Sequence, residues 1–227
     1  MKISCAQIET PIILTPDNPF LLCIENPNEF YRVVTELVSA FNGEKSEFTF
    51  WENDKQINAD SVGEILTELF TFDLTDKKTV SLLHKKLQQN FSQSALLFEF
   101  EKVKAEAEKF LVAVCEEENF SLEYGEIQFD TLLKACAVKP EKTYDTLLEK
   151  IVCFINIYIE LKGCYVFAFV GLKSVLDDEE LKLLYKHCQL HKVSLLLIEN
   201  SAHRALTDNE RAIIITQDLC EIIENFN

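Results

Sequence analysis

Four short apolar runs constrain most tightly what this chain can fold into. They lie at residues 20–25 (FLLCIE), 164–170 (CYVFAFV), 194–199 (SLLLIE) and 212–216 (AIIIT). A strand with one face in water alternates apolar and polar residues, whereas these runs are apolar nearly throughout. Such runs are typical of parallel strands that are buried on both faces. The three late runs therefore predict a mostly parallel sheet that is covered on both sides.

Both ends of the chain carry an α/β pattern. Asn26 and Pro27 predict the start of a helix, and Asn42 with Gly43 predicts its end. Further strands are expected at residues 2–7, 11–14 and 48–51, and further helices at 144–161, 177–191 and 218–226. In the middle, apolar residues recur at helical spacing without strand-like alternation. The predicted helices there are residues 65–70, 74–91, 95–118 and 129–137.

This order predicts a two-domain, discontinuous architecture. Residues 1–61 and 143–227 form an α/β head domain, and residues 62–142 form an α-helical domain inserted into it. The 48% of apolar residues can support a packed core, so a disordered chain is excluded.

Charge and cysteine usage limit the cellular setting. The chain has 22 Lys and Arg against 38 Asp and Glu, a formal charge of −16. Its average field therefore opposes nucleic acid and anionic membranes, and such a partner would need a local basic surface. The eight cysteines form no C-x-x-C pair and no secretory signal precedes them, which indicates reduced thiols in a cytoplasmic protein. The apolar stretch 151–170 contains Glu160 and Lys162, so no membrane span is expected.

Nucleotide hydrolysis finds little support in the sequence. An apolar strand that ends in Glu199 resembles the acidic strand of P-loop enzymes, but a phosphate loop also needs glycines before a Lys. None of the glycines stands in a G-x-x-x-x-G-K-[ST] frame; they are Gly43, Gly63, Gly125, Gly163 and Gly171. His187 and His191 have helical spacing but lack the further ligands of a zinc site. With no hydrolytic triad either, we expect a non-enzyme that binds no nucleotide.

Lysines are concentrated in the predicted insertion. Between residues 77 and 98 there are four lysines and no acid, and Lys78 and Lys85 are seven residues apart on one predicted helix. That spacing places them within about 20° of each other around the helix. Two interpretations stay open, a solvated lysine-rich face or a surface that follows DNA phosphates without reading bases. The candidate DNA-binding residues are Lys78, Lys85, Lys86, Lys134, Lys139 and Lys142.

An acidic segment follows the long predicted helix. Glu116, Glu117 and Glu118 are consecutive, and Glu123 and Glu126 come soon after. Carboxylates gathered at a helix end can hold calcium, but they can equally form a solvated acidic surface. A metal-dependent nuclease would also need a His or Lys beside a metal pair, which this spacing does not supply.

The order of several segments resembles a known family. The segments are KISCAQIETPIIL, FLLCIEN, FTFWENDKQI, LEYGEIQFDTLLKACAVKPE, DTLLEKI, CYVFAFVGLKSVLDDEELKLL and SLLLIEN, which run nearly from end to end. Their order, spacing and total length are similar to those of the small CRISPR-associated accessory protein of type II-A systems. That family is required for the acquisition of new spacers.

The resemblance implies a fold and a function. It implies an ATPase-like head that has lost nucleotide chemistry, a helical leg, and a homotetrameric ring whose basic lumen encircles double-stranded DNA at free ends. It implies Ca²⁺ at Glu117, Glu123 and Glu126, although Ser121 and Gly125 stand where the family tends to have acids. The implied partners are duplex DNA, other copies of the chain, the integrase complex and the effector nuclease. The alternative is a protein-interaction adaptor with a degenerate ATPase-like fold and no DNA binding of its own.

Overall fold

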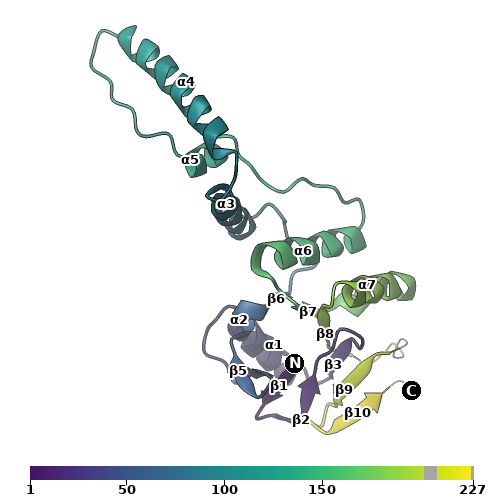
Figure 1. Cartoon of the computed structure of the whole chain (residues 1–227). Coiled ribbons are helices and arrows are strands. Elements are labelled where there is room, and N and C mark those ends of the chain that lie inside the picture. The colour runs from purple at the N-terminus through teal and green to yellow at the C-terminus, as the bar shows by residue number, and fades with distance from the viewer. Residues whose placement is uncertain (202–208, 226–227) are drawn as a thin grey trace. The chain divides into compact units, whose positions relative to one another are not determined.

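The computed structural model describes residues 1–201 and 209–225 and divides the chain into two compact units. Met1–Phe72 and Thr143–Asn227 form the first, here called the sheet unit, and Asp73–Lys142 form the second, the helical unit (Figure 1). Residues 62–72, expected in the helical part, belong to the sheet unit because they supply one of its strands.

A six-stranded sheet forms the centre of the sheet unit. Its strand order is β10-β9-β3-β8-β7-β6. The strands are β3 (Phe20–Ile24), β6 (Gly63–Leu66), β7 (Val166–Val170), β8 (Ser194–Glu199), β9 (Arg211–Ile215) and β10 (Glu221–Asn225). The first five are parallel, and β10 is antiparallel to β9. The mostly parallel sheet that the apolar runs predict is confirmed.

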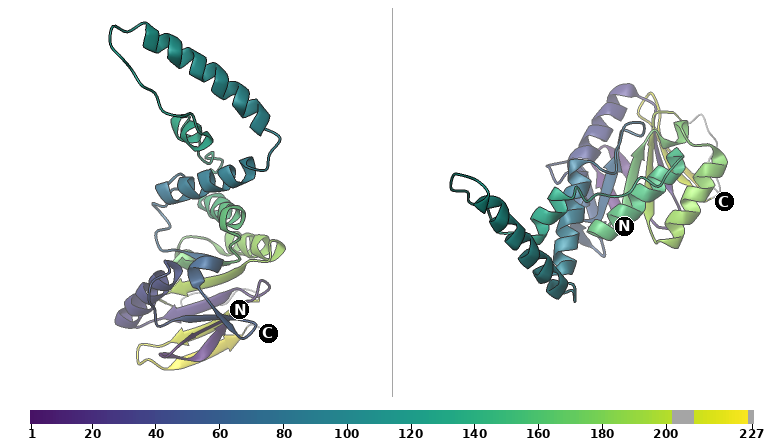
Figure 2. Two further views of the ribbon diagram at one scale, coloured as in Figure 1. Left: turned by 60° about the vertical axis from the view of Figure 1, so that its left-hand side comes forward. Right: turned by 90° about the horizontal axis from the view of Figure 1, so that it is seen from above.

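Helices cover both faces of this sheet. On one face, α1 (Pro27–Phe41) packs its buried Val33 and Leu37 against Leu22 and Ala168 in a continuous apolar core. On the other face lie α6 (Leu147–Lys162) and α7 (Asp178–Leu190) (Figure 2). The one-turn 3-10 helix η1 (Leu172–Ser174) lies between β7 and α7 in the chain. The ring of Phe154 on α6 meets that of Phe167 at 5.8 Å between centroids. Burial on both sides explains why these strands carry no polar alternation.

A smaller antiparallel sheet packs on the α1 side, in the order β2-β1-β4-β5. Its strands are β1 (Lys2–Cys5), β2 (Ile8–Ile13), β4 (Thr49–Glu52) and β5 (Lys55–Ile57), and α2 (Ala59–Val62) follows them. Asn53 and Asp54 both have positive φ between β4 and β5, as a two-residue hairpin turn requires.

Two predicted helices in this unit are wrong. The helix expected at residues 65–70 is replaced by β6, which pairs with β7. At Gly63 an added Cβ would lie 2.4 Å from the Val166 carbonyl oxygen, so the absence of a side chain lets β6 approach. The helix expected at 218–226 is strand β10, which forms a hairpin with β9. In both short segments pairing with a neighbouring strand outweighs the local helical pattern.

The helical unit contains α3 (Lys77–Phe91), α4 (Leu97–Glu116) and α5 (Phe129–Ala135). Three rings join them: Phe91 stacks on Phe129 at 4.0 Å, and Phe100 meets each of these rings edge-on. No residue of α4 is buried. Within residues 1–201 and 209–225, no helix combines the length and apolar character needed to cross a membrane.

Candidate nucleic-acid interface

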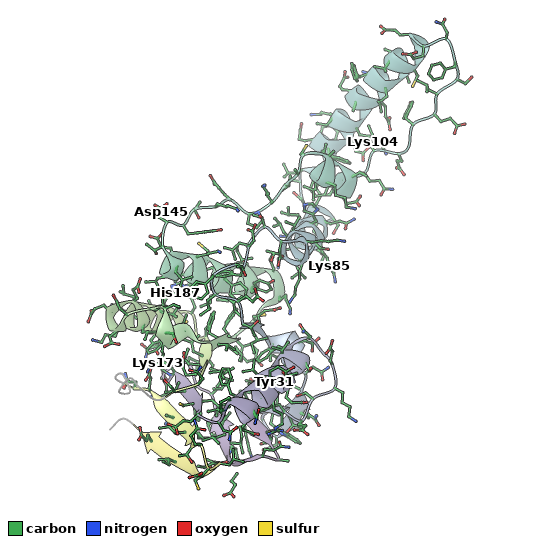
Figure 3. All side chains as sticks on the ribbon, turned by 180° about the vertical axis from the view of Figure 1, so that it is seen from behind. Tyr31, Lys85, Lys104, Asp145, Lys173 and His187 are labelled. Carbon is green, nitrogen blue, oxygen red and sulfur yellow. The ribbon has the colours of Figure 1, made fainter. Side chains whose placement is uncertain are left out.

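Helix α3 presents lysines on its outer face. Asp76 caps the helix by accepting a hydrogen bond from the Thr79 amide at 2.6 Å, which fixes where the helical repeat begins. Thr79 is buried, whereas Lys78 and Lys85 are exposed. The two exposed lysines share one side of α3, about 10 Å apart along its axis. Lys85 lies on α3 in Figure 3, and the half-buried Lys86 lies about 100° around the helix from it.

The local charge of α3 differs from that of the whole chain. The sequence between residues 77 and 98 contains four lysines and no acid. A field depends on the charges nearby, so the outer face of α3 is positive even though the protein carries −16 overall. Such a face attracts phosphates without any donor pattern that could distinguish bases.

Two of the other candidate lysines already have carboxylate partners. Lys134 binds Asp130 at 3.0 Å, and Lys142 binds Asp73 at 3.5 Å. The hydrogen bond from Lys134 lowers the pKa of Asp130. All six candidate lysines lie in the helical unit. Because phosphates would have to displace these two carboxylates, stronger phosphate contacts are expected from the exposed Lys85 and Lys139.

The side chains of the candidate calcium residues do not form one cluster within the chain. Glu126 binds Lys104 at 2.9 Å, and this hydrogen bond lowers the pKa of Glu126; Lys104 is labelled on α4 in Figure 3. Glu117 and Glu123 are exposed. Across residues 1–201 and 209–225, no three carboxylate, imidazole or thiol side chains meet in a group that could hold a metal. The residues of a single chain therefore do not fit a calcium site, and calcium binding stays a prediction.

Sequence reasoning missed the role of Lys104. This lysine pairs with Glu126, a candidate ligand 22 residues away. No local spacing signals this pair, because the loop after α4 has to bring Glu126 back beside the helix.

Helix α4 leaves an apolar stripe uncovered. From Leu96 the apolar positions recur at alternating steps of four and three residues, the repeat with which one helix packs on another. The stripe consists of Leu96, Phe100, Val103, Ala107, Phe110 and Val114. Its outer part is open: Phe110 is 68% exposed and Val103 is 52% exposed. Large apolar patches of this kind mark interaction surfaces.

The carboxyl ends of the parallel strands, where α/β sheets commonly bind ligands, are filled by the protein itself. Glu199 at the end of β8 accepts a hydrogen bond from the Lys173 amide at 2.7 Å, so this carboxylate is already occupied. The Lys173 ammonium reaches the fully buried Glu210, which precedes β9, at 2.8 Å. At the start of α1, the Asn26 side chain accepts from the amides of Asn28 and Glu29. These amides are the ones that a phosphate at this helix end would otherwise use.

Comparison with known proteins identifies the family. A family model described as CRISPR-associated protein (Cas_Csn2) matches residues 40–219, more than half of the chain. The chain belongs to the Csn2 family. The resemblance to type II-A CRISPR accessory proteins is thereby confirmed.

A curated relative agrees with this assignment, and a solved structure shares the fold. The chain is 22% identical over 206 residues to the CRISPR-associated protein Csn2 of Enterococcus faecalis, covering 88% of this chain and 90% of that protein. The crystal structure of Stu0660 of Streptococcus thermophilus superposes with a TM-score of 0.60 at 12% identity. That alignment covers 100% of this chain and 76% of the other, and it supports the fold.

Proposed function

We propose that this Csn2 family member is a non-enzymatic protein that binds the ends of double-stranded DNA, without sequence preference, during spacer acquisition in the cytoplasm. The DNA-binding form is a homotetrameric ring, and the helical units line its lumen. The closed ring holds the duplex topologically while lysines contact phosphates. Its further partners are the integrase complex and the effector nuclease of the same CRISPR system.

The lysine face of α3 carries this proposal. Lys78 and Lys85 stand on one side of the helix, and Lys86 lies beside them. Each phosphate contact releases counterions from the duplex, so the affinity should fall steeply as salt rises. Four copies of this face around one duplex would multiply the effect without requiring any base contact.

The apolar stripe of α4 supports assembly. A helix of 20 residues with no buried side chain gains little stability within one chain. Burying a phenylalanine such as Phe110 between copies contributes on the order of 2 kcal/mol. Helix-on-helix contact between copies would therefore bury the stripe.

A non-catalytic head is consistent with the filled carboxyl edge of the sheet. Glu199 at the end of β8 accepts from the Lys173 amide, and the first amides of α1 are capped by Asn26. We therefore expect neither ATP binding nor hydrolysis, which equilibrium dialysis with labelled ATP and a phosphate-release assay would test. Either activity in the purified chain would contradict this part of the proposal.

The deciding experiment compares a linear duplex with the same DNA as a closed circle, at low salt, together with the mass of the free protein. Binding only to the linear form by a tetramer is the expected result. Equal binding to both forms would indicate an open basic surface or a ring that opens. A monomer that binds neither form would overturn the proposal.

The adaptor alternative is favoured by one observation, the exposed apolar stripe, which could receive a different protein. It predicts no affinity for DNA at any salt concentration. Charge reversal at Lys85 would then leave every interaction of the protein unchanged.

A further inference from the structure

A histidine on α3 contacts the chain segment that follows α5. The His84 Nε2 atom lies 2.7 Å from the Val138 carbonyl oxygen, 54 residues along the sequence. A carbonyl only accepts, so this geometry requires a proton on Nε2. His84 thus donates a hydrogen bond that restrains the backbone of the segment after α5.

The end of α5 aims the chain at this contact. The Ala137 amide donates to the Lys134 carbonyl and the Val138 amide to the Leu133 carbonyl, both at 3.0 Å. Ala137 has φ +49°, a left-handed conformation that costs a non-glycine residue about 1 kcal/mol. Such an ending is usually given to glycine. Here the turn directs the Val138 carbonyl onto α3, where His84 holds it.

Lys139 follows immediately and is restricted from both sides. Its preceding carbonyl is held by His84, and its following residue is Pro140, which confines Lys139 to extended backbone conformations. The Lys139 side chain is exposed. Its ammonium group is therefore presented from a fixed backbone, although it lies outside any helix.

Two contacts show where this backbone lies relative to α3. Phe129 at the start of α5 stacks on Phe91 at the end of α3, and Val138 after α5 reaches His84 in the middle of α3. The segment 129–139 therefore runs back along α3. This places Lys139 beside the turn of α3 that carries Lys85.

We propose that His84 is a positioning residue for DNA binding. By donating from Nε2 to the Val138 carbonyl, it keeps Lys139 beside Lys85, so that both ammonium groups contact phosphates of one duplex. His84 itself touches no DNA. The inference rests on the proposed DNA binding and adds to it a residue that no lysine pattern reveals.

The contact can be tested without DNA. Long-range ¹H–¹⁵N spectra of the full-length protein should show His84 with a proton on Nε2, its signals being identified by their loss in His84→Ala. Observation of the Nδ1–H tautomer would overturn the proposal, because the Val138 carbonyl would then have no donor.

The DNA experiment uses variants matched to the geometry. A glutamine amide can reach the position of Nε2, whereas an asparagine amide is too short. We expect His84→Gln to bind linear duplex as the wild type does. His84→Asn and His84→Ala should lower the slope of log K against log salt by about 0.9 for each copy whose Lys139 loses its phosphate contact. Lys139→Gln should produce the same change.

Double variants separate positioning from general damage. Adding Lys139→Gln to His84→Ala should change the affinity no further, whereas adding Lys85→Gln should lower it by the full effect of the single Lys85 variant. Additivity with Lys139, or failure of His84→Gln to restore binding, would overturn the proposal. A wild-type chain without DNA affinity would instead contradict the proposed function, and the tautomer result would still stand.

Discussion

Individual lysines differ in what they can offer a phosphate. Lys134 and Lys142 are each paired with a carboxylate of the same unit. A phosphate that binds either lysine must replace this carboxylate, so the net gain in binding free energy is small. Lys85 faces outward with no acid nearby in sequence. The residue type is the same, but the worth of each contact is set by its neighbours.

Lys85→Gln should weaken binding to every duplex sequence equally and lower the salt slope by about 0.9 per site. The measurement is fluorescence anisotropy with two unrelated duplexes at several salt concentrations. Lys55→Gln, an exposed lysine on β5 in the sheet unit, is the matched control and should change nothing. A sequence-dependent loss would show that Lys85 reads bases.

The buried pair of Lys173 and Glu210 predicts a large stability effect. Lys173→Met leaves the Glu210 carboxylate buried without its cation, which should cost about 3–5 kcal/mol of unfolding free energy. Urea denaturation measures it, and Lys182→Met on the exposed side of α7 should stay within about 0.5 kcal/mol of wild type. The double variant Lys173→Met/Glu210→Gln should recover part of the loss; a further loss would contradict this account.

His187 predicts a pH dependence of stability. Burial, and then the charge of His191, lowers the pKa of His187, whose Nε2 lies 3.0 Å from the Asn156 side-chain oxygen. The unfolded chain therefore takes up this proton at a higher pH, near 6.5. The contribution of His187 to stability is present above that pH and is lost as pH falls through the folded pKa. Urea midpoints for His187→Gln should decline less between pH 7 and 5 than those of wild type; parallel declines would refute it.

At the scale of elements, the sequence predicts well where local chemistry decides. The cap at Asn26 and the strand at residues 194–199 are both found as expected. Strands β6 and β10 are not predicted, because each is short and forms only by pairing with a neighbouring strand. The pairing of β6 depends on the absence of a side chain at Gly63. Strand β10 depends on its hairpin with β9. The lysine face of α3 can likewise be predicted from the residue spacing. The pairs Lys104–Glu126 and His84–Val138 cannot, because they depend on loops that bring distant parts of the sequence together.

The stripe of α4 makes a prediction at this scale. Phe110→Ser should shift the protein from the proposed tetramer to smaller species, because each copy loses on the order of 2 kcal/mol of buried apolar surface. Sedimentation velocity measures the mass, and circular dichroism checks that the helix content is kept. Glu101→Gln, on the opposite side of α4, is the control. An unchanged mass for Phe110→Ser would place the assembly surface elsewhere.

At the scale of the whole molecule, the net charge of −16 does not show that basic and acidic residues are concentrated in different segments. Lysines concentrate on α3 and after α5, and acids such as Glu116, Glu117 and Glu118 lie at the end of α4. A protein with this arrangement can repel DNA from most of its surface and still bind it along one face. The DNA-binding ring stays a prediction until the linear and circular duplexes are compared.

Calcium also belongs to this scale, since no group of ligands forms within the described part of one chain. If Glu117 and Glu123 meet acids of another copy, calcium should raise the melting temperature of the assembled protein and leave a Phe110→Ser monomer unaffected. Differential scanning fluorimetry with calcium and with magnesium makes the comparison. An equal shift in both proteins would mean that the ion binds within one chain.

The helical unit begins at Asp73 and ends at Lys142, and these two residues are joined by an ion pair of 3.5 Å. The two ends of the helical unit are therefore close together. For the folding of the sheet unit, the helical unit is thus equivalent to a short loop, whatever its length. A chain in which residues 73–142 are replaced by a short glycine-rich linker should therefore retain the fold of the sheet unit.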